Sequence, residues 1–264
     1  RMACIGLNVK VVYNPHGWSF NMESTKKNFY IMLERIMAKF CDAIICISEA
    51  EKKSAIKYRI CKENKLYVVY NGIDIQEYKK EEVVLPIPND VFVVGMVGRI
   101  CKQKAPDTFI RMAYEVQKKI SNVYFVIVGD VIEEAQEEKR KIEDLAKSLG
   151  VKLLITGWVE NPLAYMSRFD VGFGLTIPEY MITGIPIVAS SVDAIPYLIK
   201  DGEEGLLVEK DDWSSAADKV IELLNDTEKR EKIVKNAEIT VRKRFDAKRV
   251  SKECENIFET LVNV

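Results

Sequence analysis

Two cationic side chains that could bind a diphosphate follow an apolar stretch near the middle of the chain. The run from Val91, VFVVGMVG, is apolar enough to predict a parallel strand buried on both faces. Arg99 follows it directly, with Lys104 five residues on. An arginine forks onto phosphate oxygens and a lysine adds a point charge, so the pair suits an anionic ligand. Taken alone, however, such a pair is more often two surface charges.

The stretch 172–190, GFGLTIPEYMITGIPIVAS, has the composition of a phosphate-binding loop. Gly172 and Gly174 lack a Cβ, so the backbone there can approach a ligand closely. Pro178 fits the first turn of a helix, whose free N–H groups and dipole favour a phosphate. Glu179 follows it and can reach a hydroxyl-rich neighbour of that phosphate. A glycine-rich turn before a helix is nevertheless more often simple turn chemistry.

His16 is the only histidine in the chain. It lies in the turn 14–17, NPHG, after a short strand predicted at 11–13. Loops at the carboxyl ends of strands are where open α/β sheets place ligands. A lone histidine is more often a structural hydrogen-bonding group, so the position alone leaves both roles open.

These stretches resemble the retaining glycosyltransferases of family four, which have the GT-B fold. The string 172–190 is similar to their donor-site motif, and GRICKQKAPD at 98–107 is similar to their diphosphate clamp. HGWSF at 16–20 resembles a loop of the bacterial O-antigen and capsular polysaccharide enzymes of that family. The resemblance covers nearly the whole chain. It implies an α/β fold of two Rossmann-like domains with parallel sheets, the first incomplete at its N-terminus.

The resemblance also implies a role for each matching residue. His16 is expected beside the donor sugar and the reaction centre, where it positions the sugar. Arg99 and Lys104 are expected to stabilise the leaving diphosphate, and Glu179 to bind the ribose. Amides of the loop are expected on the diphosphate, and main-chain groups after the strand at 151–155 are expected at the nucleotide base. The donor-binding residues besides Glu179 are therefore Gly98, Gly157, Val159, Gly172, Phe173, Gly174, Leu175 and Thr176.

The sequence departs from the family pattern just before Gly172. The family normally has a glutamate there, and this chain has Val171. The run 169–171 also meets the loop directly, so a buried strand of roughly 5 to 8 residues is expected to be missing. The early strands of the first domain have no counterpart either. We therefore expect the native polypeptide to be longer.

The order of the predicted elements suggests two domains. A linker is expected at 81–90, because this charged segment contains Pro86 and Pro88. The first domain is expected at 1–80 and the donor-binding domain at 91–246. A final helix at 247–264 is expected to cross back to the first domain, as the GT-B resemblance implies. In the second domain, further strands are expected at 123–128, 151–155 and 206–208, and helices at 108–120, 135–149, 213–224 and 227–245.

Composition is that of an ordinary globular protein, with 48% hydrophobic and 30% charged residues. No apolar run approaches the roughly 18 residues of a membrane span. The six cysteines form no CxxC pair, and with one histidine they lack the spacing of a zinc site. Scattered, reduced thiols favour a cytoplasmic protein. No metal is expected, since a DxD motif is absent, and no cofactor beyond the nucleotide-sugar substrate.

The first part of the chain is basic. Residues 1–80 hold 14 lysines and arginines against 8 aspartates and glutamates. Either this is a solvated face without a partner, or it meets an anionic membrane surface or a lipid-linked diphosphate. Nucleic acid is disfavoured, because no reader motif accompanies the charge. A predicted helix at 24–40 carries an apolar stripe that either packs in the core or lies on a membrane. The stripe is Phe29, Met32, Leu33, Ile36, Met37 and Phe40.

The sequence therefore predicts a metal-independent, retaining glycosyltransferase of surface polysaccharide biosynthesis. Its donor is expected to be a UDP-sugar, and its acceptor a glycan, most simply a lipid-linked oligosaccharide at the inner membrane face. Two alternatives stay open. One is a non-catalytic nucleotide-sugar-binding protein, which the missing glutamate before Gly172 favours. The other is a sugar-nucleotide epimerase of the same fold.

Overall fold

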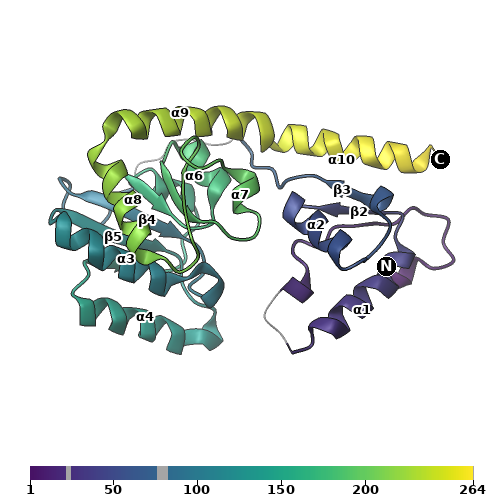
Figure 1. The fold of residues 1–264 in the computed structure, drawn as a ribbon, viewed down its shortest axis with the longest axis horizontal. Coiled ribbons are helices and arrows are strands. Elements are labelled where there is room, and N and C mark those ends of the chain that lie inside the picture. The colour runs from purple at the N-terminus through teal and green to yellow at the C-terminus, as the bar shows by residue number, and fades with distance from the viewer. Residues whose placement is uncertain (22–24, 76–82, 264) are drawn as a thin grey trace. The chain divides into compact units, whose positions relative to one another are not determined.

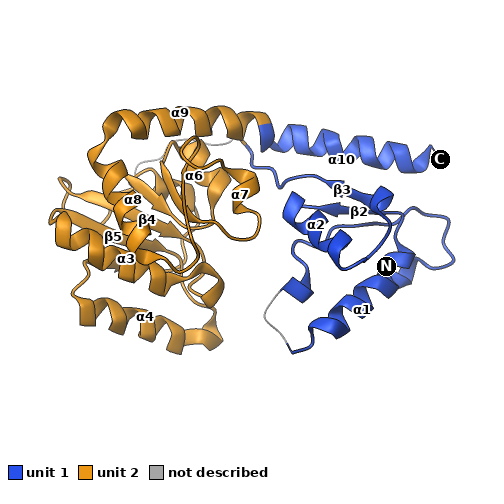
Figure 2. Ribbon diagram, in the orientation of Figure 1, with its two compact units in different colours: residues 1–74, 244–264 blue, residues 75–243 orange. Residues whose placement is uncertain are grey.

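The structure is a computed structural model, and the part of the chain that it describes forms two compact units. Residues 1–74 and 244–264 make up the first unit, and residues 75–243 the second (Figure 2). The described residues are 1–21, 25–75 and 83–263. The linker predicted at 81–90 begins outside them.

The first unit is built on a three-stranded parallel sheet of order β1-β2-β3 (Figure 1). The central strand, β2, is buried throughout, because both of its faces are covered. Ile44 and Cys46 face a core that includes Trp18, while Ile45 faces Ile257 of the last helix. The strands and helices of this unit are β1 (Val12–Tyr13), β2 (Ala43–Cys46), β3 (Leu66–Val68), α1 (Lys27–Met37), α2 (Glu49–Lys57) and α10 (Ala247–Val262).

The apolar stripe of the first predicted helix is largely exposed in this unit. Helix α1 occupies part of the predicted range, which also includes residues 22–24 outside the described structure. Its buried contact is Ile31. Four side chains of the stripe are between 40% and 53% exposed, so they are not core residues of the described unit. They are Phe29, Met32, Leu33 and Ile36.

The second unit is built on a six-stranded parallel sheet of order β6-β5-β4-β7-β8-β9, of which Figure 1 labels β4 and β5. The strands are β4 (Phe92–Val97), β5 (Val123–Val128), β6 (Leu153–Ile155), β7 (Val171–Phe173), β8 (Ile187–Ser190) and β9 (Leu206–Val208). The helices are α3 (Pro106–Lys119), α4 (Gln136–Leu149), α5 (Pro162–Met166), α6 (Ile177–Thr183), α7 (Ile195–Leu198), α8 (Trp213–Asn225) and α9 (Thr227–Arg244). Apolar residues of α3, α4 and α8 pack together with the sheet in one core.

The order of these strands reverses between β4 and β7. From β4 the chain adds β5 and β6 on one side, and then returns to add β7, β8 and β9 on the other. In a doubly wound sheet, ligands bind outside the carboxyl ends of the strands at such a reversal. The fold therefore indicates the ends of β4 and β7 as the place for a ligand.

The place of the strand expected before the glycine loop is taken by β7, which residues of the predicted loop itself supply. β7 is formed by Val171, Gly172 and Phe173, the last two of which belong to the predicted loop itself. They pair with β4 on one side and with β8 on the other. The gap between two buried strands has to be filled by backbone that satisfies its hydrogen bonds, and these residues fill it.

No helix in the described ranges is both long enough and apolar enough to cross a lipid bilayer.

Candidate functional site

The carboxyl end of β4 carries two of the predicted site residues. Gly98 follows the strand with φ +138°, a conformation that favours glycine, and donates its N–H to the Val128 carbonyl. A Cβ on Gly98 would lie 3.2 Å from Cε of Lys104. The lysine side chain therefore lies against the bare backbone of Gly98, while Arg99 beside it is exposed.

Lys104 and Glu179 are brought close enough to interact, although they lie 75 positions apart in the sequence. Burial lowers the pKa of Lys104, and the positive charge of Arg99 lowers it further, whereas Cys101 and Glu179 raise it. Burial raises the pKa of Glu179, while its own backbone N–H and Lys104 lower it. Two partly desolvated groups of opposite charge thus lie at the reversal of strand order, with Arg99 next to them. Such perturbed groups are typical of functional sites.

The loop after β7 is shorter than predicted and offers fewer amides. The Gly172 N–H donates to the Pro186 carbonyl and the Gly174 N–H donates to the Val188 carbonyl. Both amides are therefore used in hydrogen bonds to the neighbouring segment that contains β8. Gly172 and Phe173 are buried strand residues. The expectation that these amides bind a diphosphate is therefore not supported by their geometry. The connection between β7 and α6 consists of Gly174, Leu175 and Thr176.

Thr176 ties this short loop to the end of β4, because its hydroxyl donates to the Val97 carbonyl over 3.0 Å. The loop then enters α6 with Pro178 in the first turn and Glu179 next to it, as predicted. Glu179 is thereby placed on the same edge of the sheet as Lys104.

Tyr180, which was not among the predicted site residues, lies at the centre of this arrangement. It is completely buried. Its hydroxyl accepts the Val97 N–H at 3.1 Å and lies 3.2 Å from the carbonyls of Gly95 and Phe173, to one of which it donates. A Cβ on Gly172 would lie 2.6 Å from the tyrosine ring. The glycine therefore makes room for Tyr180, which nothing in the local sequence pattern marks as part of the site.

The residues predicted at the nucleotide base follow β6, next to the turn that follows β5. Gly157 has φ +78° and forms an isolated antiparallel bridge with Gly129. Next to it, Trp158 is 62% exposed, and its indole N–H donates to the Val131 carbonyl over 3.3 Å. Val159 follows and is partly buried. The two turns thus lie side by side on the same edge of the sheet as the end of β4.

His16 belongs to the first unit and follows β1. Its side chain is exposed and its backbone is left-handed, with φ +48°. The next residue, Gly17, donates its N–H to the carboxylate of Glu51. In the sequence, Glu51 is recognisable only as part of an acidic helix start, which gives no sign of this contact. Burial raises its pKa, while hydrogen bonds from the Ile47 and Gly17 N–H groups and the charge of His16 lower it.

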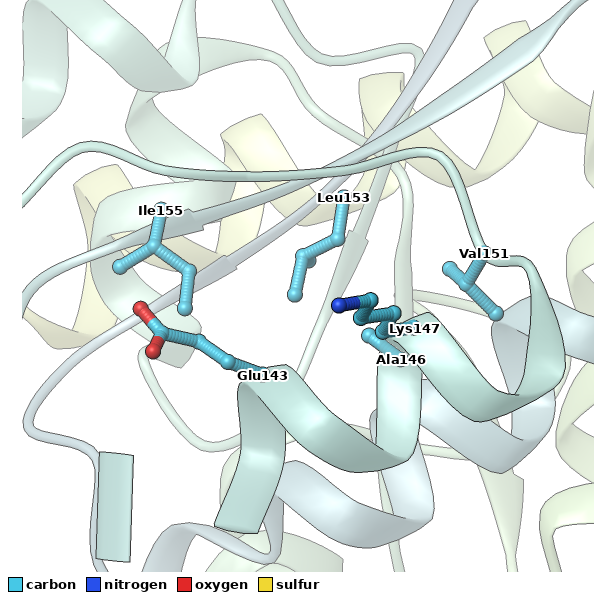
Figure 3. Close-up of a pocket in the computed structure, with 6 residues that line it drawn as sticks. All are labelled: Glu143, Ala146, Lys147, Val151, Leu153 and Ile155. Carbon is cyan, nitrogen blue, oxygen red and sulfur yellow. The ribbon is translucent and has the colours of Figure 1, made fainter. Parts of the chain in front are cut away.

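A hollow of about 420 Å³ lies elsewhere in the second unit, between α4 and β6 (Figure 3). Ala146, Val151, Leu153 and Ile155 line it together with Glu143 and Lys147, which reach from α4. The predicted site residues, all of which belong to the described ranges, do not line it. We therefore assign the site to the reversal of strand order and not to this hollow.

Solved structures define the class of fold. The structure of Anabaena HepE in complex with UDP matches with a TM-score of 0.86 and 22% identity, covering 100% of this chain and 75% of that one. Sucrose-phosphate synthase from Thermosynechococcus elongatus matches with a TM-score of 0.85 and 20% identity, covering 99% of this chain and 70% of that one. The fold is therefore that of the GT-B glycosyltransferases, an α/β fold, as the sequence predicts.

The chain belongs to the family described as glycosyl transferases group 1, which matches residues 77–240. Residues 1–77 match the description Glycosyltransferase Family 4. A capsular polysaccharide biosynthesis glycosyltransferase, CapM, of Staphylococcus aureus is 28% identical over 95% of this chain and 70% of its own length. An Escherichia coli UDP-Gal:alpha-D-GlcNAc-diphosphoundecaprenol alpha-1,3-galactosyltransferase is 29% identical over 82% of this chain and 60% of its own length. This chain thus spans about 60% to 70% of the length of these relatives.

Proposed function

We propose that the protein is a retaining glycosyltransferase that transfers a sugar from a UDP-sugar to a glycan during surface polysaccharide biosynthesis. The observation that supports this most is the gathering of Arg99, Lys104 and Glu179 where the strand order reverses. The names of the capsular and diphosphoundecaprenol-linked relatives support a lipid-linked acceptor.

The chemistry breaks the bond between the anomeric carbon and the donor phosphate while the acceptor oxygen bonds to the same carbon. Negative charge develops on the leaving diphosphate, so fixed positive groups lower the barrier. Arg99 and Lys104 supply that charge, and no bound cation is required. The acceptor attacks on the face from which the diphosphate leaves, and its proton passes to a donor phosphate oxygen. In this mechanism His16 positions the sugar, and Glu179 binds the ribose.

Measuring UDP release from a panel of UDP-sugars, with and without a lipid-linked acceptor, tests this function. A transferase releases UDP in step with acceptor and forms a glycoside that keeps the anomeric configuration. An epimerase converts the donor sugar without any acceptor. Release that does not depend on acceptor, or an inverted product, would contradict the proposal.

A non-catalytic nucleotide-sugar-binding protein is the second candidate. It is favoured by Val171 in place of the family's glutamate and by the use of the Gly172 and Gly174 amides within the sheet. Such a protein binds UDP in calorimetry, yet releases no UDP from any sugar donor in the same panel.

The affinity for UDP is expected to fall as the pH rises into the alkaline range. The protonated form of Lys104 binds the diphosphate, and burial places its pKa below the ordinary value of 10.5. Deprotonation, and with it the loss of affinity, therefore begins at a lower pH than for an exposed lysine. Titration calorimetry across pH measures the effect, with Lys104→Arg as the control, because arginine keeps its charge. Parallel pH profiles for the two proteins would contradict the role of Lys104.

The exposed stripe of α1 supports a peripheral position at the cytoplasmic face of an anionic membrane. Met32→Glu and Leu33→Glu are each expected to weaken binding to vesicles containing anionic lipid by about 10- to 150-fold, since each side chain loses about 1.5 to 3 kcal/mol of burial in the membrane. Ile239→Glu is the control, because Ile239 is also exposed, at 58%, but lies on α9. Vesicle sedimentation measures binding. Equal losses for all three variants would count against a membrane role for α1.

A further inference from the structure

Glu51 is a buried carboxylate for which the proposed chemistry has no use. It is 5% exposed, although it is charged. Each of its carboxylate oxygens accepts a main-chain hydrogen bond, Oε1 from Gly17 and Oε2 from Ile47 over 2.7 Å. Hydrogen bonds to a carboxylate are stronger than those between neutral groups. Through the Glu51 carboxylate, these two hydrogen bonds connect Gly17, in the loop after β1, with Ile47, which precedes the N-cap residue of α2.

The main chain of Glu51 also forms a hydrogen bond with the same loop. Its carbonyl accepts the indole N–H of Trp18 over 2.9 Å. Its N–H donates to the hydroxyl of Ser48, the N-cap of α2, over 3.1 Å. Trp18 is buried and stacks on Phe20 with ring centroids 5.2 Å apart. One helical turn thus holds both residues that come after His16.

The loop needs such support because its backbone is unfavourable. His16 has φ +48° and Gly17 has φ +104°, two left-handed residues in succession. A residue with a Cβ adopts this conformation only where its surroundings determine it. A further side-chain bond to this part of the loop is long, since the Asn14 side chain accepts the His16 N–H at 3.3 Å. Within the described part of the chain, Glu51 is therefore the main polar restraint on the conformation of His16.

We propose that Glu51 is a positioning residue, which holds the loop 16–18 so that the His16 imidazole is presented in the geometry that transfer requires. This inference rests on the proposed function of His16. A glutamine at position 51 keeps the size of the side chain, but turns an NH₂ group toward one of the two N–H donors. It should therefore release one of the two contacts of the carboxylate without opening a cavity.

Donor turnover in a double-mutant cycle tests the proposal. Glu51→Gln is expected to lower kcat by about 10- to 100-fold, because a misplaced group costs that much in rate. In a His16→Ala protein the same change should have no further effect, since the group that it positions is gone. Glu49→Gln is the matched control, in the same turn of α2 but outside this set of bonds, and should leave kcat unchanged.

The outcomes separate this inference from the proposed function. If His16→Ala lowers kcat and Glu51→Gln does not, the positioning role is wrong and the role of His16 stands. If both lower kcat and their losses multiply, Glu51 acts independently of His16 and the proposal is overturned. If His16→Ala has no effect on kcat, both ideas fall together.

A second variant keeps the test decisive if Glu51→Gln does not fold. A Cβ on Gly17 would meet no atom within 4 Å, but φ +104° is unfavourable for alanine. Gly17→Ala should therefore displace the loop while leaving the Glu51 side chain intact, and lower kcat to a similar extent. Hydrogen exchange of the peptide spanning 14–18 should become faster in the same variant. Unchanged kcat together with faster exchange would overturn the proposal.

Discussion

Replacing Arg99 or Lys104 with alanine is expected to lower donor turnover by about 10²- to 10³-fold for each substitution. This is the usual loss when one fixed group that stabilises developing negative charge is removed from an active site. The Lys104 side chain lies against Gly98, so its ammonium is near the carboxyl end of β4, where the charge of Glu179 also acts on it. Arg99 is exposed next to it, so its guanidinium can turn toward phosphate oxygens.

Initial rates of UDP release measure this effect, and UDP affinity is determined in parallel. Lys102→Ala is the matched control, because Lys102 is an exposed lysine of the same segment that does not fit the clamp motif. It should keep nearly full turnover. Turnover that survives both Arg99→Ala and Lys104→Ala would show that the diphosphate binds elsewhere.

Replacing Tyr180 with alanine is expected to lower the free energy of unfolding by about 3 to 5 kcal/mol, as for other large aromatic residues in cores. The ring is completely buried against Gly172, and its hydroxyl links β4 to the end of β7. Tyr180→Phe removes the hydroxyl alone and leaves the Val97 N–H without this acceptor. That variant should cost about 1 to 3 kcal/mol.

Urea unfolding of the three proteins measures both effects. Tyr114→Phe is a suitable control, since Tyr114 is only partly buried and lies on α3, away from the β4–β7 pair. It should leave stability within about 0.5 kcal/mol of the parent protein. A Tyr180→Phe variant as stable as the parent would mean that the hydroxyl is not what joins the two strands.

Much of the site could be predicted from local patterns. Arg99 and Lys104 follow a strand that its apolar run identifies, and Glu179 follows Pro178 in a first helical turn that its composition identifies. Strand-end loops and helix starts depend on nearby residues, so the spacing of the sequence is enough to find them. The structure places Lys104 and Glu179 close enough for their charges to interact. The ligand roles of all three residues stay predictions.

The glycine loop shows where local patterns were insufficient. Gly172 and Gly174 have the composition of a ligand-binding turn, yet their amides complete the sheet. Whether an amide is free depends on which strands lie beside it, and the partners of β7 are β4 and β8, from distant parts of the chain. Likewise, the apolar period of α1 predicts a helix, but only the tertiary structure decides that Met32 and Leu33 remain exposed.

The sequence by itself determined the buried strands and the positions of the charged residues that follow them, because these depend on composition and short-range periodicity, while its resemblance to the family-four enzymes implied the α/β fold with two parallel sheets. Only the tertiary structure decided that β7 fills the place beside β4, that Tyr180 occupies the space above Gly172, and that Glu51 binds the loop of His16. The physical reason is the same in each case. Buried backbone and buried polar groups need hydrogen-bond partners, and those partners come from segments that the chain brings together only when it folds.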